Sequence, residues 1–115
     1  MLQRNGKSFR SAAQSEASFY GEELSFAAAE AYKRLRTHVL FSFADGESCH
    51  VIGVTSAAPS DGKSLTSLNF AYSLAEMKQK VLLIDADMSR PSQPLKLGME
   101  QAPGLSNLLV SVNNI

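Results

Sequence analysis

VIGVTSAAPSDGKSLTSLNFAYSLAE, residues 51–76, together with VLLIDA, residues 81–86, is the stretch of sequence that decides the fold. The run from Cys49 to Thr55 is apolar without alternation, which is typical of a strand that is buried on both faces. Apolar residues then recur at helical spacing from Lys63 to about Met77, before the second apolar run. Strand, helix and strand in this order predict a right-handed βαβ unit in a parallel α/β sheet with flanking helices.

The residues before this unit predict a helix and a polar arm. SFAAAEAYKRLRTHVLFSF, residues 25–43, has apolar residues three and four positions apart, so they share one face of a helix. Ser25 is the expected cap of this helix, and Asp45-Gly46 is its expected stop. Residues 1–21 are polar and predict a mobile arm, which leaves 22–115 as the folded part.

The residues after the unit predict a loop and then a further helix. RPSQPLKLG, residues 90–98, is interrupted by proline and is expected to be a loop. GLSNLLVSV, residues 104–112, has the pattern of a helix start. Because a parallel α/β domain usually takes about 150 residues or more, 115 residues predict only part of such a domain.

Composition and charge exclude several classes of protein. The chain has 44% hydrophobic residues and 19% charged residues, and its 11 basic and 11 acidic side chains leave no net charge. A nucleic-acid binder would need a basic surface, so that function is not expected. Cys49 is the single cysteine, and no apolar run approaches the roughly 20 residues that span a bilayer. We therefore expect a cytoplasmic protein without disulfides.

A phosphate-binding loop is predicted between the first strand and the following helix. The segment AAPSDGKS fits the pattern G-x-x-x-x-G-K-[ST] except at its first position, where alanine replaces glycine. Backbone N–H groups at such a strand-to-helix turn converge on phosphate oxygens. The alternative is an ordinary turn that happens to contain Gly-Lys-Ser. The residues expected to bind nucleotide are Ala57, Ala58, Pro59, Ser60, Asp61, Gly62, Lys63 and Ser64.

Two carboxylates follow the second apolar run. Asp85 and Asp87 lie at the predicted carboxyl end of a parallel strand, the edge at which such sheets bind ligands. Carboxylates held close together repel one another unless a cation or hydrogen-bond donors offset the charge, which favours a Mg²⁺-nucleotide beside them. One carboxylate is expected to hold the metal and the other to orient or deprotonate an attacking hydroxyl. The alternative is a solvated strand end with a helix-capping aspartate.

Other polar residues give weaker signals. His38, His50 and Cys49 lack the spacing of metal ligands, so no zinc site is expected, and Cys49 is interpreted as a buried filler.

The sequence resembles the bacterial tyrosine kinases of capsular and exopolysaccharide synthesis. Four segments of the chain follow the order and spacing of that family: EAYKRLRTHVLFS, the stretch 51–76, VLLIDADMSRPS and PGLSNLL. The resemblance implies a P-loop NTPase-like fold, ATP and Mg²⁺ as cofactors, and an autophosphorylating protein-tyrosine kinase. It also implies a membrane-anchored polysaccharide co-polymerase that activates the kinase and recruits it to the inner face of the membrane.

The resemblance assigns roles to residues of this chain. Lys63, Asp85 and Asp87 would be catalytic, with Ser64 and Asp85 as metal ligands. Glu30, Lys33 and Arg36 stand at the positions of the E-x-x-R-x-x-R helix motif that the family uses to self-associate, but Lys33 replaces an arginine and lacks its bidentate fork. A solvated charged face is the alternative interpretation.

The resemblance also implies parts that would lie beyond Ile115, namely a Walker B strand with a third aspartate and a C-terminal tyrosine cluster. The chain by itself is therefore expected to be inactive. The related partition and cell-division ATPases provide the alternative function, a nucleotide-switched assembly ATPase. Those proteins have a lysine where this chain has Ala58, which favours the kinase.

Overall fold

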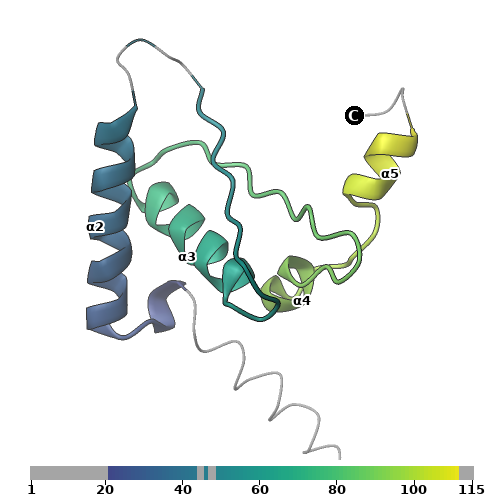
Figure 1. The fold of residues 1–115 in the computed structure, drawn as a ribbon, viewed down its shortest axis with the longest axis horizontal. Coiled ribbons are helices and arrows are strands. Elements are labelled where there is room, and N and C mark those ends of the chain that lie inside the picture. Colours follow the sequence, from purple (N-terminus) through teal and green to yellow (C-terminus); the bar gives the residue numbers. More distant parts are fainter. Residues whose placement is uncertain (1–20, 44–45, 47–48, 112–115) are drawn as a thin grey trace, which may run out of the picture.

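Helices and connecting segments make up the part of the chain that the structure describes. The computed structural model describes residues 21–43, 46 and 49–111. The predicted arm, apart from Gly21, and Asp45 of the predicted helix stop lie outside these residues. The helices are η1 (Gly21–Glu23), α2 (Phe26–Ser42), α3 (Lys63–Glu76), α4 (Gln93–Leu97) and α5 (Leu105–Val110), as Figure 1 shows.

Helix α2 begins where the sequence predicts. The hydroxyl of Ser25 accepts a hydrogen bond from the backbone N–H of Ala28 at 3.3 Å, so it satisfies one of the free donors of the first turn. The helix ends at Ser42, just before the predicted Asp45-Gly46 stop. It packs beside α3 (Figure 1).

Helix α3 contributes most of the buried residues. Leu68, Asn69, Phe70 and Ser73 are buried on it, and together they form one continuous strip of the helix. The Asn69 side chain accepts a hydrogen bond from the backbone N–H of Gly21 at 3.1 Å, which holds η1 against α3. Gly21 has φ +63°, and a Cβ atom there would lie 3.2 Å from the ring of Tyr72. A side chain at position 21 would therefore disturb this contact.

The Arg36 guanidinium joins α2 to α3. Its Nη1 donates a hydrogen bond to the backbone carbonyl of Ser73 and lies 3.9 Å from a carboxylate oxygen of Glu76. The Arg36 side chain is 14% exposed, whereas the Glu76 side chain is 44% exposed. Because the Glu76 carboxylate is largely in water, the bond to the carbonyl is the more important tie between the two helices.

Replacing Arg36 by alanine is expected to lower the free energy of unfolding by about 1.5–3 kcal/mol, the usual value of a hydrogen bond to a charged group. Urea denaturation measures this change. Arg34→Ala is the matched control, because Arg34 is exposed on the same helix. Equal losses of stability in the two variants would show that Arg36 does not tie α2 to α3.

The predicted strands do not form a sheet in this structure. Residues 49–56 and 79–87 run as long non-helical traces beside α3, and no strand occurs within 21–43, 46 and 49–111 (Figure 1). The prediction that the first run is buried on both faces is wrong, because Val51 is 96% exposed; in the second run Leu82 is 82% exposed. A strand needs a neighbouring ladder for its backbone groups, and among the described residues the runs lie against helices and form no such ladder.

The segment 90–98, predicted to be a loop, contains the short helix α4. Pro94 is its second residue, a position where the missing N–H costs no helical hydrogen bond. Gly98 ends the helix with φ +65°, a left-handed conformation that glycine adopts without strain. The next predicted helix is confirmed as α5, which lies on the far side of α4 from α2 (Figure 1). In the described part of the chain, no helix is both long and apolar enough to cross a membrane.

Candidate phosphate-binding site

The predicted phosphate loop leads directly into α3. Residues 57–62 are exposed, and Lys63 and Ser64 are the first two residues of the helix. Gly62 precedes the helix with φ +86°, and Ser60 has φ +63°. Two of the three residues before the helix therefore have the left-handed backbone conformation. The backbone N–H of Ala58 donates to the Asp61 carboxylate at 3.1 Å, which closes the loop from within. The loop therefore presents the free N–H groups of the α3 N-terminus to solvent.

The two side chains that the pattern assigns to phosphate and metal both have partners within the chain. Lys63 Nζ donates a hydrogen bond to the hydroxyl of Ser56 at 3.0 Å. The Ser64 hydroxyl accepts a hydrogen bond from the Ser92 hydroxyl at 2.7 Å. In both bonds the partner is a neutral serine hydroxyl, so neither Lys63 nor Ser64 is held in an ion pair among the residues that the structure describes. Lys63 can exchange its hydroxyl partner for a stronger anionic one.

Asp85 and Asp87 differ in what they contact. One oxygen of Asp85 accepts hydrogen bonds from the backbone N–H groups of Ser92 and Gln93, at 2.9 and 3.0 Å. Its other oxygen accepts from the Asp87 N–H at 3.1 Å. Asp85 thus satisfies two backbone N–H groups at the start of α4, where Ser92 is the N-cap residue. Asp87 is exposed, and within the described residues its carboxylate accepts one hydrogen bond, from the Arg90 N–H at 3.0 Å.

The start of α4 joins the acidic segment to the phosphate loop. The side-chain amide nitrogen of Gln93 donates to the Ser64 carbonyl at 2.8 Å and to the Ser67 hydroxyl at 3.1 Å. Together with the Ser92 hydroxyl, it fixes Asp85 near the first turn of α3. The structure therefore brings the two predicted motifs together. Sequence reasoning missed Ser92 and Gln93, although a serine just before Gln-Pro is a recognisable helix-start signal.

The residues of this site fit a magnesium nucleotide. Mg²⁺ prefers oxygen ligands and is usually held by one or two protein groups together with substrate phosphates and water. The Ser64 hydroxyl and the two carboxylates supply such oxygens, and the exposed loop leaves room for phosphate. No cluster of three or more histidine, cysteine, aspartate or glutamate side chains that suits a metal occurs in the described ranges. A metal here would therefore depend on the phosphates for the remaining ligands.

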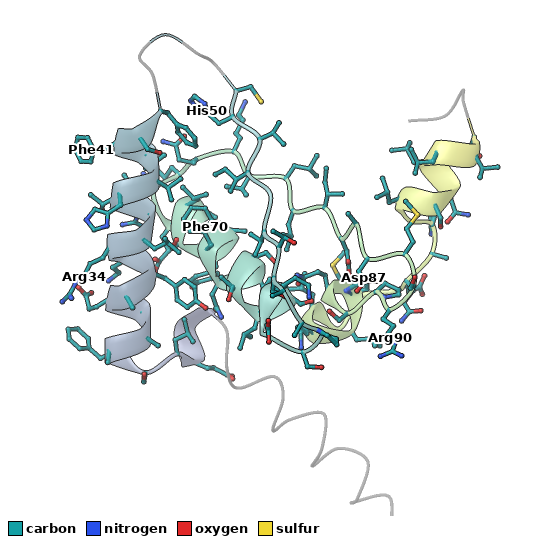
Figure 2. All side chains as sticks on the ribbon, in the orientation of Figure 1. Arg34, Phe41, His50, Phe70, Asp87 and Arg90 are labelled. Carbon is teal, nitrogen blue, oxygen red and sulfur yellow. The ribbon has the colours of Figure 1, made fainter. Side chains whose placement is uncertain are left out.

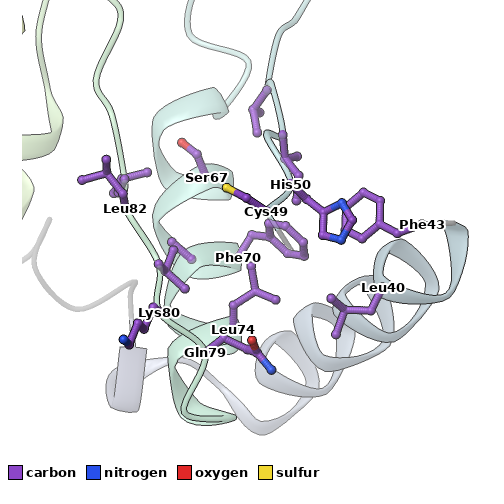
Figure 3. A pocket seen from close by; sticks show the side chains of 15 residues that line it. Leu40, Phe43, Cys49, His50, Ser67, Phe70, Leu74, Gln79, Lys80 and Leu82 are labelled. Carbon is purple, nitrogen blue, oxygen red and sulfur yellow. The ribbon is translucent and has the colours of Figure 1, made fainter. Parts of the chain in front are cut away.

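Cys49 lies at an open pocket of about 260 Å³, between α2, α3 and the two non-helical runs (Figure 3). The interpretation of Cys49 as a buried filler is wrong, because its side chain is exposed. The ring of His50 stacks on Phe43, with the ring centroids 3.9 Å apart and the planes 4° from parallel. This stack joins the end of α2 to the first run, and it gives His50 a packing role.

The three residues predicted to contact another copy of the chain differ in their partners: these residues are Glu30, Lys33 and Arg36. Lys33 and Glu30 form an ion pair at 3.0 Å, with side chains 44% and 36% exposed. Arg36 instead bonds to α3, as described above. Figure 2 shows the exposed neighbour Arg34 on the outer side of α2. Only Glu30 and Lys33 of the three are thus available to a second molecule without loosening α2 from α3.

We expect the double replacement of Glu30 and Lys33 by alanine to lower the mass of assemblies seen by light scattering, if this pair contacts another copy. An exposed pair of this kind contributes only about 0.3–0.5 kcal/mol within a helix, so the fold should be unaffected. Arg34→Ala is the control for loss of charge on the same helix. An unchanged mass would assign Glu30 and Lys33 to a solvated face.

Comparison with known protein families places this site in a class. The family model ParA, described as the NUBPL iron-transfer P-loop NTPase, matches residues 47–112, which contain both motifs. The chain therefore belongs to the ParA-type P-loop NTPases. No solved structure gives a significant match.

The chain is also similar to individual curated proteins, among them tyrosine-protein kinases and an iron-sulfur cluster carrier protein. The tyrosine-protein kinase YwqD of Bacillus subtilis is 36% identical over 86 residues, 75% of this chain and 36% of that protein. The tyrosine-protein kinase Wzc of Salmonella typhimurium is 33% identical over 88 residues, 76% of this chain and 12% of that protein. The iron-sulfur cluster carrier protein of Helicobacter pylori is 42% identical over 53 residues, 46% of this chain and 14% of that protein. The resemblance to bacterial tyrosine kinases is confirmed. The chain spans about a third or less of these relatives.

Proposed function

We propose that this chain is the nucleotide-binding part of a protein-tyrosine kinase that uses Mg²⁺-ATP. The observation that carries the proposal is the junction of the two motifs: Ser64 and Asp85 are linked through the first residues of α4. Similarity to YwqD and Wzc, which are named tyrosine-protein kinases, supports the reaction type.

The residues of the site would have two kinds of role in phosphoryl transfer: some bind and position the nucleotide, and one accepts a proton. Bound Mg²⁺ would neutralise charge on the ATP phosphates. Lys63 and the free N–H groups of the loop bind phosphate oxygens, and Ser64 supplies a metal ligand. Asp87 is exposed and accepts a hydrogen bond from the Arg90 N–H, so its second carboxylate oxygen can orient a tyrosine hydroxyl and accept its proton. Asp85 holds the acidic segment in register with the loop.

The proposal includes where the kinase acts. We infer a cytoplasmic protein that assembles with further copies of itself. A membrane-anchored activator of polysaccharide assembly would recruit it to the inner face of the membrane.

Phosphotyrosine formation tests the proposal. The natural protein is purified from its own source cells and incubated with Mg²⁺-ATP. Phosphotyrosine is then measured by antibody and by mass spectrometry. We expect phosphotyrosine that depends on both ATP and Mg²⁺. ATP hydrolysis without any phosphotyrosine would contradict the kinase and support the alternative ATPase.

A second candidate function, a nucleotide-switched carrier or assembly ATPase, is favoured by the family model and by the Helicobacter pylori relative. Iron–sulfur clusters are held mainly by cysteine thiolates, and this chain has one cysteine, Cys49. Reconstitution with iron and sulfide, followed by visible absorption, would test cluster binding. We expect no stable cluster, because a single thiol per chain supplies too few ligands.

A further inference from the structure

Ser92 and Gln93 lie between the phosphate loop and the acidic segment, and neither belongs to the two motifs. The Ser92 hydroxyl donates a hydrogen bond to the Ser64 hydroxyl at 2.7 Å, and the Ser92 backbone N–H donates to the Asp85 carboxylate at 2.9 Å. Gln93 repeats this double contact: its N–H donates to Asp85 at 3.0 Å and its side-chain amide to the Ser64 carbonyl at 2.8 Å. Each residue therefore contacts both motifs at once.

The contact with Ser92 determines which part of the Ser64 hydroxyl remains free. A serine hydroxyl has one proton and two lone pairs. When Ser92 donates, one lone pair of Ser64 is occupied and the other can face a cation. The Ser92 contact also favours one rotamer of the half-buried Ser64 side chain.

Gln93 supports the same geometry from the buried side. The residue is 7% exposed, and its amide nitrogen is held by both Ser64 and Ser67. Its amide oxygen is buried and has no hydrogen-bond partner in the described part of the chain. A buried acceptor without a donor is unfavourable, so this amide is kept in place by what its nitrogen binds. The Gln93 amide thus ties the start of α4 to the first turn of α3.

We propose that Ser92 and Gln93 are positioning residues, which set the Ser64 hydroxyl for Mg²⁺ and hold Asp85 in register with it. The proposal rests on the proposed function, because it assumes that Ser64 contacts the metal of a bound nucleotide. It goes beyond that function by making the first turn of α4 part of the metal site. Nucleotide binding with Mg²⁺ should therefore depend on two side chains outside both motifs.

Magnesium dependence separates this role from a merely structural one. Binding of a fluorescent ADP analogue to the full chain is titrated with Mg²⁺ and compared with binding in EDTA. We expect Ser92→Ala to raise the Mg²⁺ concentration at half-maximal binding at least fivefold, with affinity in EDTA within twofold of the parent chain. Ser92→Thr keeps the hydroxyl and should restore the parent value. Ser89→Ala removes an exposed serine nearby and should change neither value.

Two results would overturn the proposal. One is an unchanged Mg²⁺ midpoint in Ser92→Ala, and the other is an equal fall in affinity with and without Mg²⁺. A parent chain that binds no nucleotide would instead contradict the proposed function. In that case amide hydrogen exchange of residues 66 and 67, which follow the free N–H groups of the first turn of α3, still tests the contacts without ligand. Faster exchange in both Ser92→Ala and Gln93→Leu would support them, and unchanged exchange would overturn them.

Discussion

Replacing Lys63 by methionine is expected to weaken Mg²⁺-ATP binding by at least tenfold, which corresponds to about 1.4 kcal/mol. The lysine ammonium can form a charge-assisted hydrogen bond to phosphate, and methionine cannot. In the part of the chain that the structure describes, the Lys63 ammonium donates to one partner, the exchangeable hydroxyl of Ser56. The substitution should therefore leave the fold intact, and isothermal calorimetry on the full chain measures the lost affinity directly.

The control for this experiment is Lys80→Met, which removes the same charge from an exposed lysine at the start of the second run. We expect Lys80→Met to bind Mg²⁺-ATP like the parent chain. If Lys63→Met folds normally and binds with unchanged affinity, residues 57–64 are not a phosphate loop. The ordinary turn would then be the correct interpretation.

Replacing Asp87 by asparagine is expected to reduce phosphotyrosine formation at least a hundredfold, while ATP affinity changes less than threefold. General-base catalysis contributes about 10²–10⁴-fold to a rate, so its loss has an effect of this size. Asparagine keeps an oxygen that can accept the Arg90 N–H, so the local turn survives. The rate is measured on the protein from its own cells, and the affinity by calorimetry.

Asp85→Asn is the informative comparison, because Asp85 performs a structural task. Its carboxylate accepts three backbone N–H bonds through both oxygens, and an amide has only one acceptor oxygen. We expect Asp85→Asn to lower the free energy of unfolding by about 1–2 kcal/mol, the usual value of a lost cap. Equal losses of rate and affinity in Asp87→Asn would make Asp87 a ligand rather than a base. A normal rate would remove Asp87 from the mechanism.

Helices α2, α3 and α5 were predictable because their signals are local, whereas α4 was predicted to be part of a loop. The spacing of apolar residues and the Ser25 hydroxyl are enough to define α2, and the Gly-Lys-Ser run marks the start of α3. The phosphate loop could be predicted for the same reason, since its pattern lies within eight consecutive residues.

The parts that were missed depend on residues far apart in the chain. The hydroxyls of Ser92 and Ser64 form a hydrogen bond although the residues are 28 positions apart in the sequence. Neither local sequence indicates that the two hydroxyls will be in contact. Arg36 has the same difficulty: its charge predicts an exposed contact, while its actual partner is a carbonyl on α3. The apolar run that starts at Cys49 shows that those residues favour burial, but composition alone does not say what covers them.

The exposed apolar side chains of the two runs also determine how the chain behaves when it is warmed. Val51 and Leu82 leave most of their surface in water. Removing such surface from water is driven by entropy near room temperature, and the driving force weakens on cooling. Solutions of this chain should therefore scatter more light at 30 °C than at about 4 °C, and should clear again when chilled. Ice-cold, dilute preparations are accordingly the right starting material for every measurement of affinity proposed above.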